Sequence, residues 1–539
     1  MRWFSFRSRR NRRTASFDAV WSGLRNLHQA RYRTARAGTA PAQAEAWQEA
    51  PLPRRSRAFH QALSELWQPS HDLRLRTLHI GGRDIVVAWL NGLTDNERLQ
   101  AGVFDPLTHA DAYASSPEAL AQRLTATSIT YARTMGECST ALVGGRAVVY
   151  VDRSGMALCL DVNRPPGRSV DRAENEPTVQ GPQEAMVESL DLNVALLRKR
   201  LRTPRLKVET HELGTYSRTQ VAILYIEGVA KPALVEEVRQ RLQRIRTDII
   251  TDINHVREHI TDAPFTLFPT TEETERPERV AGNLMQGRVA VIADGSPTAL
   301  LVPVTFFNFL LSPEDYYTQF TLALPLRLIR HTMFWAAILL PALYVAVLSY
   351  NQDLIPTPLL ISVAAQHAGI PFPTVAEALI MMFSFEALRE AGTRLPRAVG
   401  QSVSIVGTLI IGDAAVRAGL VSPGMIIVIA ATGVASFTLP GLGLVQTTRL
   451  LQFTFVLLAG FLGLYGIILG LMFLLGHLVS IRSFGVPYTS PIAPFIWQDM
   501  KDVIIRAPWW VMRERPRQYE TLDPVRSPSP PPAKTKEPR

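Results

Sequence analysis

The sequence predicts an α/β cytoplasmic region of two subdomains, followed by an all-α polytopic transmembrane bundle. Charged residues are frequent from Met1 to Arg330 and become rare from His331 to Ile481. Within the second stretch, Leu450–Ile481 contains no Asp, Glu, Lys or Arg and exceeds the roughly 20 residues needed to cross a bilayer. In the first stretch, strand-like and helix-like patterns alternate, which is typical of layered α/β or α+β folds.

Changes in composition set the expected domain boundaries. A basic segment opens the chain, with six arginines in its first thirteen residues; it is either a surface arm attracted to anionic lipid or a solvated tail. The tail is Pro-rich and basic, and we expect disorder from about residue 518. The six parts are a flexible segment (1–53), subdomain 1 (54–165), a linker (166–182), subdomain 2 (183–326), the transmembrane domain (327–480) and a cytoplasmic tail (481–539).

Local patterns in the first half predict individual elements. Asp84–Leu90 ends at Asn91-Gly92, as strands often do, and two further pairs of short apolar runs are separated by turn residues. The acidic and basic residues between Glu272 and Arg279 are expected in a solvated loop. The predicted elements are a hairpin of Thr140–Val143 with Ala147–Val151, helices Gln183–Leu201 and Ala233–Ile245, a strand near Gln220–Ile226, and a hairpin of Val289–Ala293 with Ala299–Val302.

The first half offers little catalytic chemistry. Phosphate-binding, dinucleotide-binding, zinc-protease and nucleophile-elbow motifs do not occur in the sequence. Cys138 and Cys159 are expected to be buried free thiols in a reducing compartment, and His255 and His259 to be surface residues without a third metal ligand. We therefore expect no enzyme, cofactor or metal. The basic arm leads into a mixed-charge domain, so nucleic acid is not expected as a partner.

The second half contains six apolar segments. The second and third are short and bounded by prolines such as Pro356 and Pro371, which favours either re-entrant pieces lining a pathway or an interfacial helix lying flat on the bilayer. A basic tail favours cytoplasmic termini and hence four or six crossings, either of which would put Arg389, Arg394 and Arg397 on the far side. The segments are Met333–Tyr350, Pro358–Ile370, Val375–Leu388, Val399–Leu420, Gly424–Pro440 and Leu450–Leu475.

Ionisable residues and glycines mark candidate sites in this half. Charged groups within apolar helices are costly and usually functional, although pairing at helical spacing is an equally good explanation for Asp413 with Arg417. Four glycines in the last segment fall on one helix face, where they permit close packing. The candidate ion-path or gating residues are Glu377, Glu386, Glu390, Asp413, Arg417, Pro371 and Pro373; the candidate packing residues are Gly460, Gly463, Gly466 and Gly470.

Several motifs of the chain, among them TERPERV (274–280), SPEDYY (312–317) and SFGVPYTSP (483–491), together resemble the spore germination GerA/SpoVAF family, which includes the germinant-receptor A subunits. The similarity is dense and ordered from about Glu174 to Pro516. Met382, His367 and Asp413 depart from common family residues, so conductance details cannot be carried over. The motifs are NEPTVQGPQEAMVESLDLNVALLRKRL (175–201), TERPERV (274–280), GRVAVIADGSP (287–297), SPEDYY (312–317), IPFPTVAEALIMMFSFEALREAGTRLP (370–396), GQSVSIVGTLIIGDAAVRAGLVSP (400–423), ASFTLP (435–440) and SFGVPYTSP (483–491).

This resemblance implies a protein of the spore inner membrane. A-type subunits of the family act with a transporter-like B-type subunit and a lipoprotein C-type subunit in sensing nutrients. They are thought to form homo-oligomeric rings in membrane lipid that release monovalent cations when a germinant binds. Two alternatives remain open from the sequence: an accessory subunit similar to SpoVAF, and a non-conducting scaffold that organises receptor partners.

Overall fold

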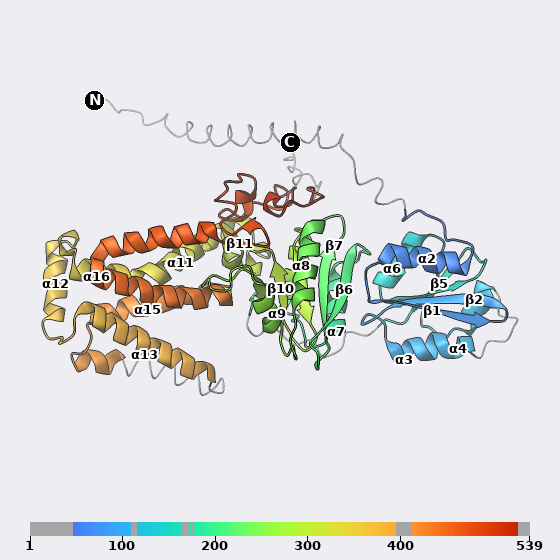
Figure 1. The fold of residues 1–539 in the computed structure, drawn as a ribbon, viewed down its shortest axis with the longest axis horizontal. Coiled ribbons are helices and arrows are strands. Elements are labelled where there is room, and N and C mark those ends of the chain that lie inside the picture. The colour runs from blue at the N-terminus through green and yellow to red at the C-terminus, as the bar shows by residue number, and fades with distance from the viewer. Residues whose placement is uncertain (1–46, 109–115, 164–172, 174–175, 395–411, 527–539) are drawn as a thin grey trace, which may run out of the picture.

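The predicted fold class is confirmed: two α/β subdomains precede an all-helical part. The computed structural model describes residues 47–108, 116–163, 173, 176–394 and 412–526, so most of the expected N-terminal segment and the end of the tail lie outside it. Figure 1 shows subdomain 1 at one end, subdomain 2 in the middle and a helical bundle at the other end. We call the bundle end that meets subdomain 2 proximal, and the opposite end distal.

Subdomain 1 contains a five-stranded antiparallel sheet in the order β1-β2-β4-β5-β3. Helices α2 and α6 pack on one face and α3 to α5 on the other (Figure 1). The elements are α2 (Ser56–Trp67), β1 (Leu73–Ile80), β2 (Arg83–Leu90), α3 (Asn96–Leu99), the π-helical turn η1 (Gln100–Phe104), α4 (Asp105–Thr108), α5 (Pro117–Arg123), β3 (Ile129–Ala132), α6 (Met135–Val143), β4 (Arg146–Val151) and β5 (Ala157–Asp161).

Subdomain 2 repeats this sheet topology. Its antiparallel strands follow the order β6-β7-β9-β10-β8, which is the same sequence of first, second, fourth, fifth and third strand. The predicted hairpin Val289–Ala293 with Ala299–Val302 is confirmed as β9 and β10. The elements are α7 (Leu190–Arg200), β6 (Leu206–Leu213), β7 (Thr219–Ile226), α8 (Pro232–Arg244), α9 (Ile253–Ile260), β8 (Glu272–Thr274), α10 (Pro277–Leu284), β9 (Val289–Ala293) and β10 (Ala299–Val302).

The predicted hairpin of Thr140–Val143 with Ala147–Val151 is wrong, because Thr140–Val143 is the last turn of helix α6 and not a strand. Thr134 and Glu137 form a reciprocal capping box that starts a helix at Met135. The expected start of subdomain 1 at residue 54 is also too late. The Gly136 N–H donates to the Gln48 carbonyl at 3.2 Å, so the chain is already part of the subdomain before that position.

The bundle contains α11 (Phe320–Ser349), α12 (Thr357–His367), α13 (Thr374–Arg394), α15 (Pro423–Phe437) and α16 (Leu442–Ser480). Among the helices that the structure describes, two, α11 and α16, are long and apolar enough to cross a membrane. Two short 3-10 helices, η2 (Phe306–Leu310) and η3 (Pro313–Tyr316), connect subdomain 2 to the start of α11. A third, η4 (Gln352–Leu354), follows the end of α11 at the distal end.

The last apolar segment is not the single span that we expected. Gly463 has a non-helical backbone conformation, with φ 61° and ψ −143°, and divides α16 into two arms. Thr447 in the first arm and His477 in the second both contact the 266–267 loop of subdomain 2, whereas Gly463 packs against Tyr350 at the distal end. Helix α16 is therefore a hairpin that runs out and back (Figure 1).

The two short Pro-bounded segments differ in their course. Helix α12 lies across the distal end, whereas α13 runs back along the bundle (Figure 1). Glu386 on α13 pairs with Arg449 near the proximal start of α16. Arg389 and Arg394 therefore lie toward the proximal end, which corrects the expectation that they lie on the far side. Arg397 and most of the expected segment Val399–Leu420 lie outside the described residues.

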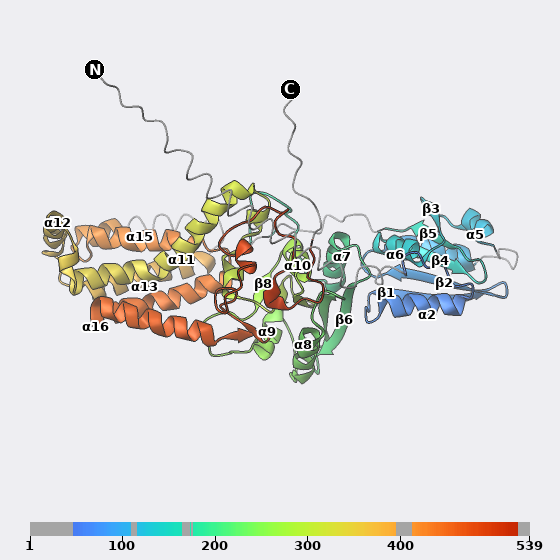
Figure 2. The same cartoon turned by 90° about the horizontal axis from the view of Figure 1, so that it is seen from above.

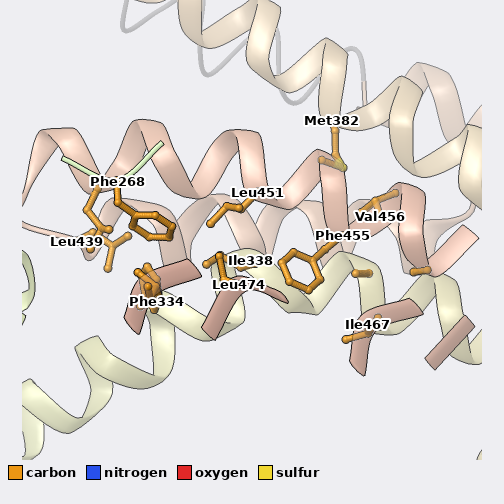
Figure 3. Close-up of a cluster of buried hydrophobic side chains, with 14 of the residues drawn as sticks. Phe268, Phe334, Ile338, Met382, Leu439, Leu451, Phe455, Val456, Ile467 and Leu474 are labelled. Atoms are coloured by element: carbon orange, nitrogen blue, oxygen red, sulfur yellow. The ribbon is translucent and has the colours of Figure 1, made fainter. Parts of the chain in front are cut away.

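One apolar core joins subdomain 2 to the bundle. Figure 3 shows Phe268, from the loop after α9, beside Phe334 of α11 and Leu439 at the end of α15. The rings of Phe268 and Phe306 lie 6.4 Å apart, and Phe306 stacks edge-on against Phe334 at 5.1 Å. Since interiors are close-packed, this shared core couples the position of subdomain 2 to that of the bundle.

Candidate functional site

Glu377 is a fully buried carboxylate near the distal end. Its Oε1 accepts hydrogen bonds from the Ser422 N–H and, at 2.5 Å, from the Ser422 hydroxyl. Ser422 is the N-cap of α15, where its hydroxyl also accepts from the Met425 N–H at 3.2 Å. His367 Nδ1, at the end of α12, lies 3.5 Å from Oε2. A negative charge here complements the α15 dipole and ties three helices together.

Glu386 is the centre of a second charged group, closer to the proximal end. Its carboxylate lies 3.0 Å from Arg449 of α16 and 3.3 Å from Arg389, one turn along α13. The Arg389 guanidinium also lies over the rings of Phe385 and Phe437. Glu377 and Glu386, two of the candidate ion-path residues, thus belong to separate groups on the same helix.

The predicted pair of Asp413 with Arg417 is formed, as is a pair of Glu390 with Arg394, and both lie on the surface of the bundle. Asp413 and Arg417 are 2.8 Å apart, with 56% and 78% of their side chains exposed. Glu390 and Arg394 are 2.7 Å apart and exposed to 61% and 79%. Pro371 and Pro373 are also exposed, in the connection between α12 and α13.

The four candidate glycines lie on three different contacts of the α16 hairpin. A Cβ at Gly460 would meet Val375 of α13 at 2.5 Å, and one at Gly470 would meet Phe455 of the first arm at 2.9 Å. A Cβ at Gly466 would lie close to the Leu458 carbonyl. Gly463 forms the turn itself. Because the helix breaks there, the glycines do not form one stripe on a continuous helix.

Sequence reasoning missed a buried charge cluster at the base of α11. Arg327 is fully buried, 3.2 Å from Asp315 and 3.4 Å from Asp502, and Arg330 lies 2.9 Å from Asp315. The Tyr316 hydroxyl donates to Asp502 at 3.0 Å. Burial and the Asp502 charge raise the pKa of Tyr316. We name this set the junction cluster: Asp315, Tyr316, Arg327, Arg330 and Asp502. The SPEDYY motif was its signal in the sequence.

A second missed cluster corrects the expected solvated loop. Glu272 is buried between Arg279 and Arg288, at 2.7 Å from each, and Arg279 also pairs with Glu176 at 2.9 Å. Burial opposes ionisation of Glu272, yet the two guanidiniums hold its pKa below the ordinary value. At Glu176, burial prevails and raises the pKa. The supposed linker at Glu176 is therefore anchored to subdomain 2, through partners about 100 residues away.

The tail is packed well past the expected start of disorder at 518. Tyr519 is 3% exposed and donates to Asn308 at 3.1 Å, and Glu514 and Val525 form an isolated β-bridge. Arg515 donates to the Met285 carbonyl at 2.7 Å, so this part of the tail packs against subdomain 2. The end of the tail from residue 527 lies outside the described residues.

A hollow with a volume of about 1260 Å³ lies between the two subdomains. Polar and basic side chains line it from both sides, including Thr130 and Arg146 of subdomain 1 and Lys199 and Arg202 of subdomain 2. In the described residues, no group of three or more His, Cys, Asp or Glu is arranged to hold a metal ion. Cys138 and Cys159 are buried free thiols, and burial raises the pKa of both.

Comparisons with known proteins agree on one family. A family profile described as Bacillus/Clostridium GerA spore germination protein matches residues 61–518. Spore germination protein KA of Bacillus subtilis (strain 168) is 39% identical over 463 residues, which cover 85% of each chain. The Bacillus subtilis protein YfkQ, described as an uncharacterized membrane protein, is 40% identical over 435 residues, or 80% of this chain and 85% of that one.

Two further matches come from Bacillus cereus and Bacillus megaterium. Spore germination protein GerLA of Bacillus cereus is 37% identical, over 85% of this chain and 94% of that one. The crystal structure of the N-terminal domain of the A subunit of the Bacillus megaterium spore germinant receptor GerK3 covers 48% of this chain and 98% of that chain, at 25% identity and a TM-score of 0.39.

Proposed function

This chain belongs to the GerA family of spore germination proteins, and from that premise we propose that it is the A-type subunit of a germinant receptor. In this proposal, copies of the chain assemble into a ring in the spore inner membrane and release monovalent cations when a nutrient binds. A transporter-like B-type subunit and a lipoprotein C-type subunit are its partners. Subdomains 1 and 2 and the tail lie in the cytoplasm.

The observation that carries the proposal is the exposure of charged groups on the bundle of a single copy. Asp413 lies close to the first turn of α15, since a Cβ at Gly412 would contact Ile426 at 3.8 Å. Inside the hydrocarbon layer a charge facing lipid is costly, and most so at the centre of the bilayer. The cost is avoided if the exposed carboxylate faces water or another copy. A closed ring provides both, because it encloses a pore on its axis.

The distribution of basic residues supports the orientation. Arg389, Arg394, Arg449 and Arg482 lie at the proximal end, on the side of the two subdomains. Cytoplasmic flanks of membrane helices carry an excess of Lys and Arg. The α16 hairpin also returns the chain to the side from which α11 starts, so the tail and the subdomains share one side.

The test is cation flux through the reconstituted receptor. The full-length protein, with B-type and C-type partners, is placed in a planar bilayer and its K⁺ and Na⁺ currents are recorded with germinant. Asp413→Asn should lower the cation current or change its selectivity. Asp353→Asn, an exposed carboxylate of η4, is the matched control and should leave the current unchanged. A silent bilayer with all partners present would refute conduction.

A non-conducting scaffold is the second candidate function. It is favoured by the fact that the exposed carboxylates already have partners within one copy, at 2.8 Å for Asp413 and 2.7 Å for Glu390. A scaffold predicts that Asp413→Asn leaves the flux of the whole receptor unchanged. It also predicts that deletion of residues 54–305 abolishes assembly of the receptor. An accessory subunit similar to SpoVAF is a close relative of the first candidate function, and it would assemble with a receptor that is already complete.

A further inference from the structure

Outside the membrane bundle, the exposed apolar side chains are concentrated at the proximal end. Between residues 47 and 261, the described parts of the two subdomains expose four large apolar side chains. The described segments 262–330 and 481–526, which surround the junction, expose fourteen. Large exposed apolar patches mark interaction sites rather than ordinary surface. The difference therefore points to a surface at the junction that is covered by something other than water.

The first turns of α11 form one part of this surface. Leu322, Leu326 and Ile329 follow a spacing of four and three residues and are 60%, 52% and 51% exposed. Arg327 and Arg330, in the same turns of the helix, are directed inward to the junction cluster. A helix in water exposes its charged face and buries its apolar face. The reversed arrangement indicates that the outer face of this segment meets an apolar medium.

The length of α11 sets the depth of that segment. Thirty residues at 1.5 Å each extend about 45 Å, whereas the hydrocarbon core of a bilayer is about 30 Å thick. The distal end of α11 is fixed beside the α16 turn, where the Tyr350 hydroxyl donates to the Gly460 carbonyl at 2.9 Å. The excess of about 15 Å therefore lies at the proximal start, which puts Leu322–Ile329 at the level of the headgroups.

The loop after α9 forms the second part. Phe265 is 100% exposed and Leu267 is 48% exposed. Their neighbour Thr266 is hydrogen-bonded to His477, and the Leu267 carbonyl accepts from Thr447, so the loop is held at the proximal ends of both α16 arms. In Figure 2, α9 and the start of α11 lie on opposite sides of the proximal end. A planar bilayer surface reaches both sides at once, at one level.

We propose that these two elements are interfacial anchors that rest in the headgroup layer of the bilayer. The first comprises Leu322, Leu326 and Ile329 of α11, and the second comprises Phe265 and Leu267. Amphipathic segments of this kind bury their apolar face at the boundary between headgroups and acyl chains. Because Arg327 and Arg330 of the same turns contact Asp315, the anchor holds the junction cluster at a fixed depth. The inference rests on the membrane insertion proposed above.

Spin labels on introduced cysteines test it in the full-length protein. Cys138 and Cys159 are 0% and 2% exposed, so the label will react with the new site. The variants are Phe265→Cys and Leu326→Cys. The water reference is Tyr216→Cys, 83% exposed in the turn between β6 and β7, and the hydrocarbon reference is Phe473→Cys, 81% exposed on the second arm of α16. The protein is reconstituted in vesicles of phosphatidylcholine and phosphatidylglycerol.

Collision of each label with oxygen and with a water-soluble nickel chelate gives its depth. We expect the labels at 265 and 326 to lie between the two references, with the chelate's access reduced at least several-fold relative to 216. Access equal to that at 216 would overturn the anchors while leaving insertion intact. Chelate access at 473 would overturn insertion itself. Spin–spin broadening at 265 or 326 that vanishes on dilution with unlabelled protein would assign the surface to a second copy and also overturn the proposal.

Discussion

Arg198 and Asp72 form a buried two-pronged ion pair that locks subdomain 2 to subdomain 1. Arg198 Nε and Nη2, on α7, donate to the Asp72 carboxylate ahead of β1 at 2.8 Å and 3.0 Å. The guanidinium also lies over the Trp67 ring at 4.9 Å. The planar fork of an arginine matches a carboxylate in this way, and a lysine does not. This buried pair therefore holds the two subdomains together at their contact.

Breaking this pair should destabilise the protein strongly. Arg198→Ala leaves the Asp72 charge buried without its partner, which costs about 3–5 kcal/mol. The measurement is urea denaturation of the full-length protein in detergent, followed by tryptophan fluorescence. Arg218→Ala is the control: its pair with Glu212, at 3.7 Å, is exposed, and such pairs contribute at most about 1 kcal/mol. Equal small effects of the two substitutions would contradict the locking role of Arg198.

The parts of the fold that the sequence predicts are those with strong local patterns. The alternation around Asp294-Gly295 predicts β9 and β10, and the loss of charge after His331 predicts the start of the bundle. Long-range partners have no local pattern. Arg279 occurs in a run of mixed charge, which is typical of a surface loop, and only folding reveals that Glu272 and Glu176 surround it. For the same reason, the sequence identified Glu377 as a candidate but could not reveal Ser422 as its partner.

The turn of α16 illustrates a different limit. Glycines repeated at three- and four-residue spacing fit one packed helix as well as a hairpin, because glycine is compatible with both. The contacts of the glycine turn with Tyr350 and Asn351, at the end of α11, distinguish the hairpin from a continuous helix. The Asn351 side chain accepts from the Leu464 N–H at 3.4 Å, where the helix has broken. This contact joins positions 113 residues apart, so no local reading of the sequence contains it.

Gly463→Ala should destabilise the hairpin. A side chain is strained at φ 61°, and its Cβ would lie 2.9 Å from the Tyr350 Cβ, so we expect a cost of at least about 1–3 kcal/mol. Gly476→Ala is the control, because a Cβ there meets nothing within 4 Å. Thermal unfolding of the detergent-solubilised protein, followed by circular dichroism, measures both. A neutral Gly463→Ala variant would show that α16 is a continuous helix in the membrane.

Glu377→Ala should weaken the distal end of the bundle. It removes the acceptor for the Ser422 N–H and hydroxyl, and a buried donor left unpaired costs about 1–3 kcal/mol. Glu377→Gln keeps an acceptor oxygen and should recover most of that loss. Glu390→Ala, at an exposed pair, should change stability by at most about 1 kcal/mol. Thermal unfolding ranks the three variants, and a Gln variant as unstable as the Ala variant would mean that the charge itself is required.

Tyr316 should make the junction sensitive to alkaline pH. The pKa of its hydroxyl is raised by burial and by the neighbouring Asp502, whereas in the unfolded chain a tyrosine has a pKa of about 10. Unfolding above that pH therefore releases a proton that the folded state retains. The stabilisation is fully present below pH of about 10 and is lost as the pH rises from there toward the folded-state pKa.

Tyr316→Phe isolates this contribution, because it removes the hydroxyl and its hydrogen bond to Asp502 while keeping the ring near Trp509. Near neutral pH the variant should be less stable by about 1–3 kcal/mol, since the Asp502 carboxylate loses a buried donor. Above about pH 10 the difference between variant and native protein should shrink. Unfolding curves at matched ionic strength on both sides of that pH measure it. A difference that is independent of pH would mean that the hydroxyl ionises equally readily in both states and that the cluster is open to water.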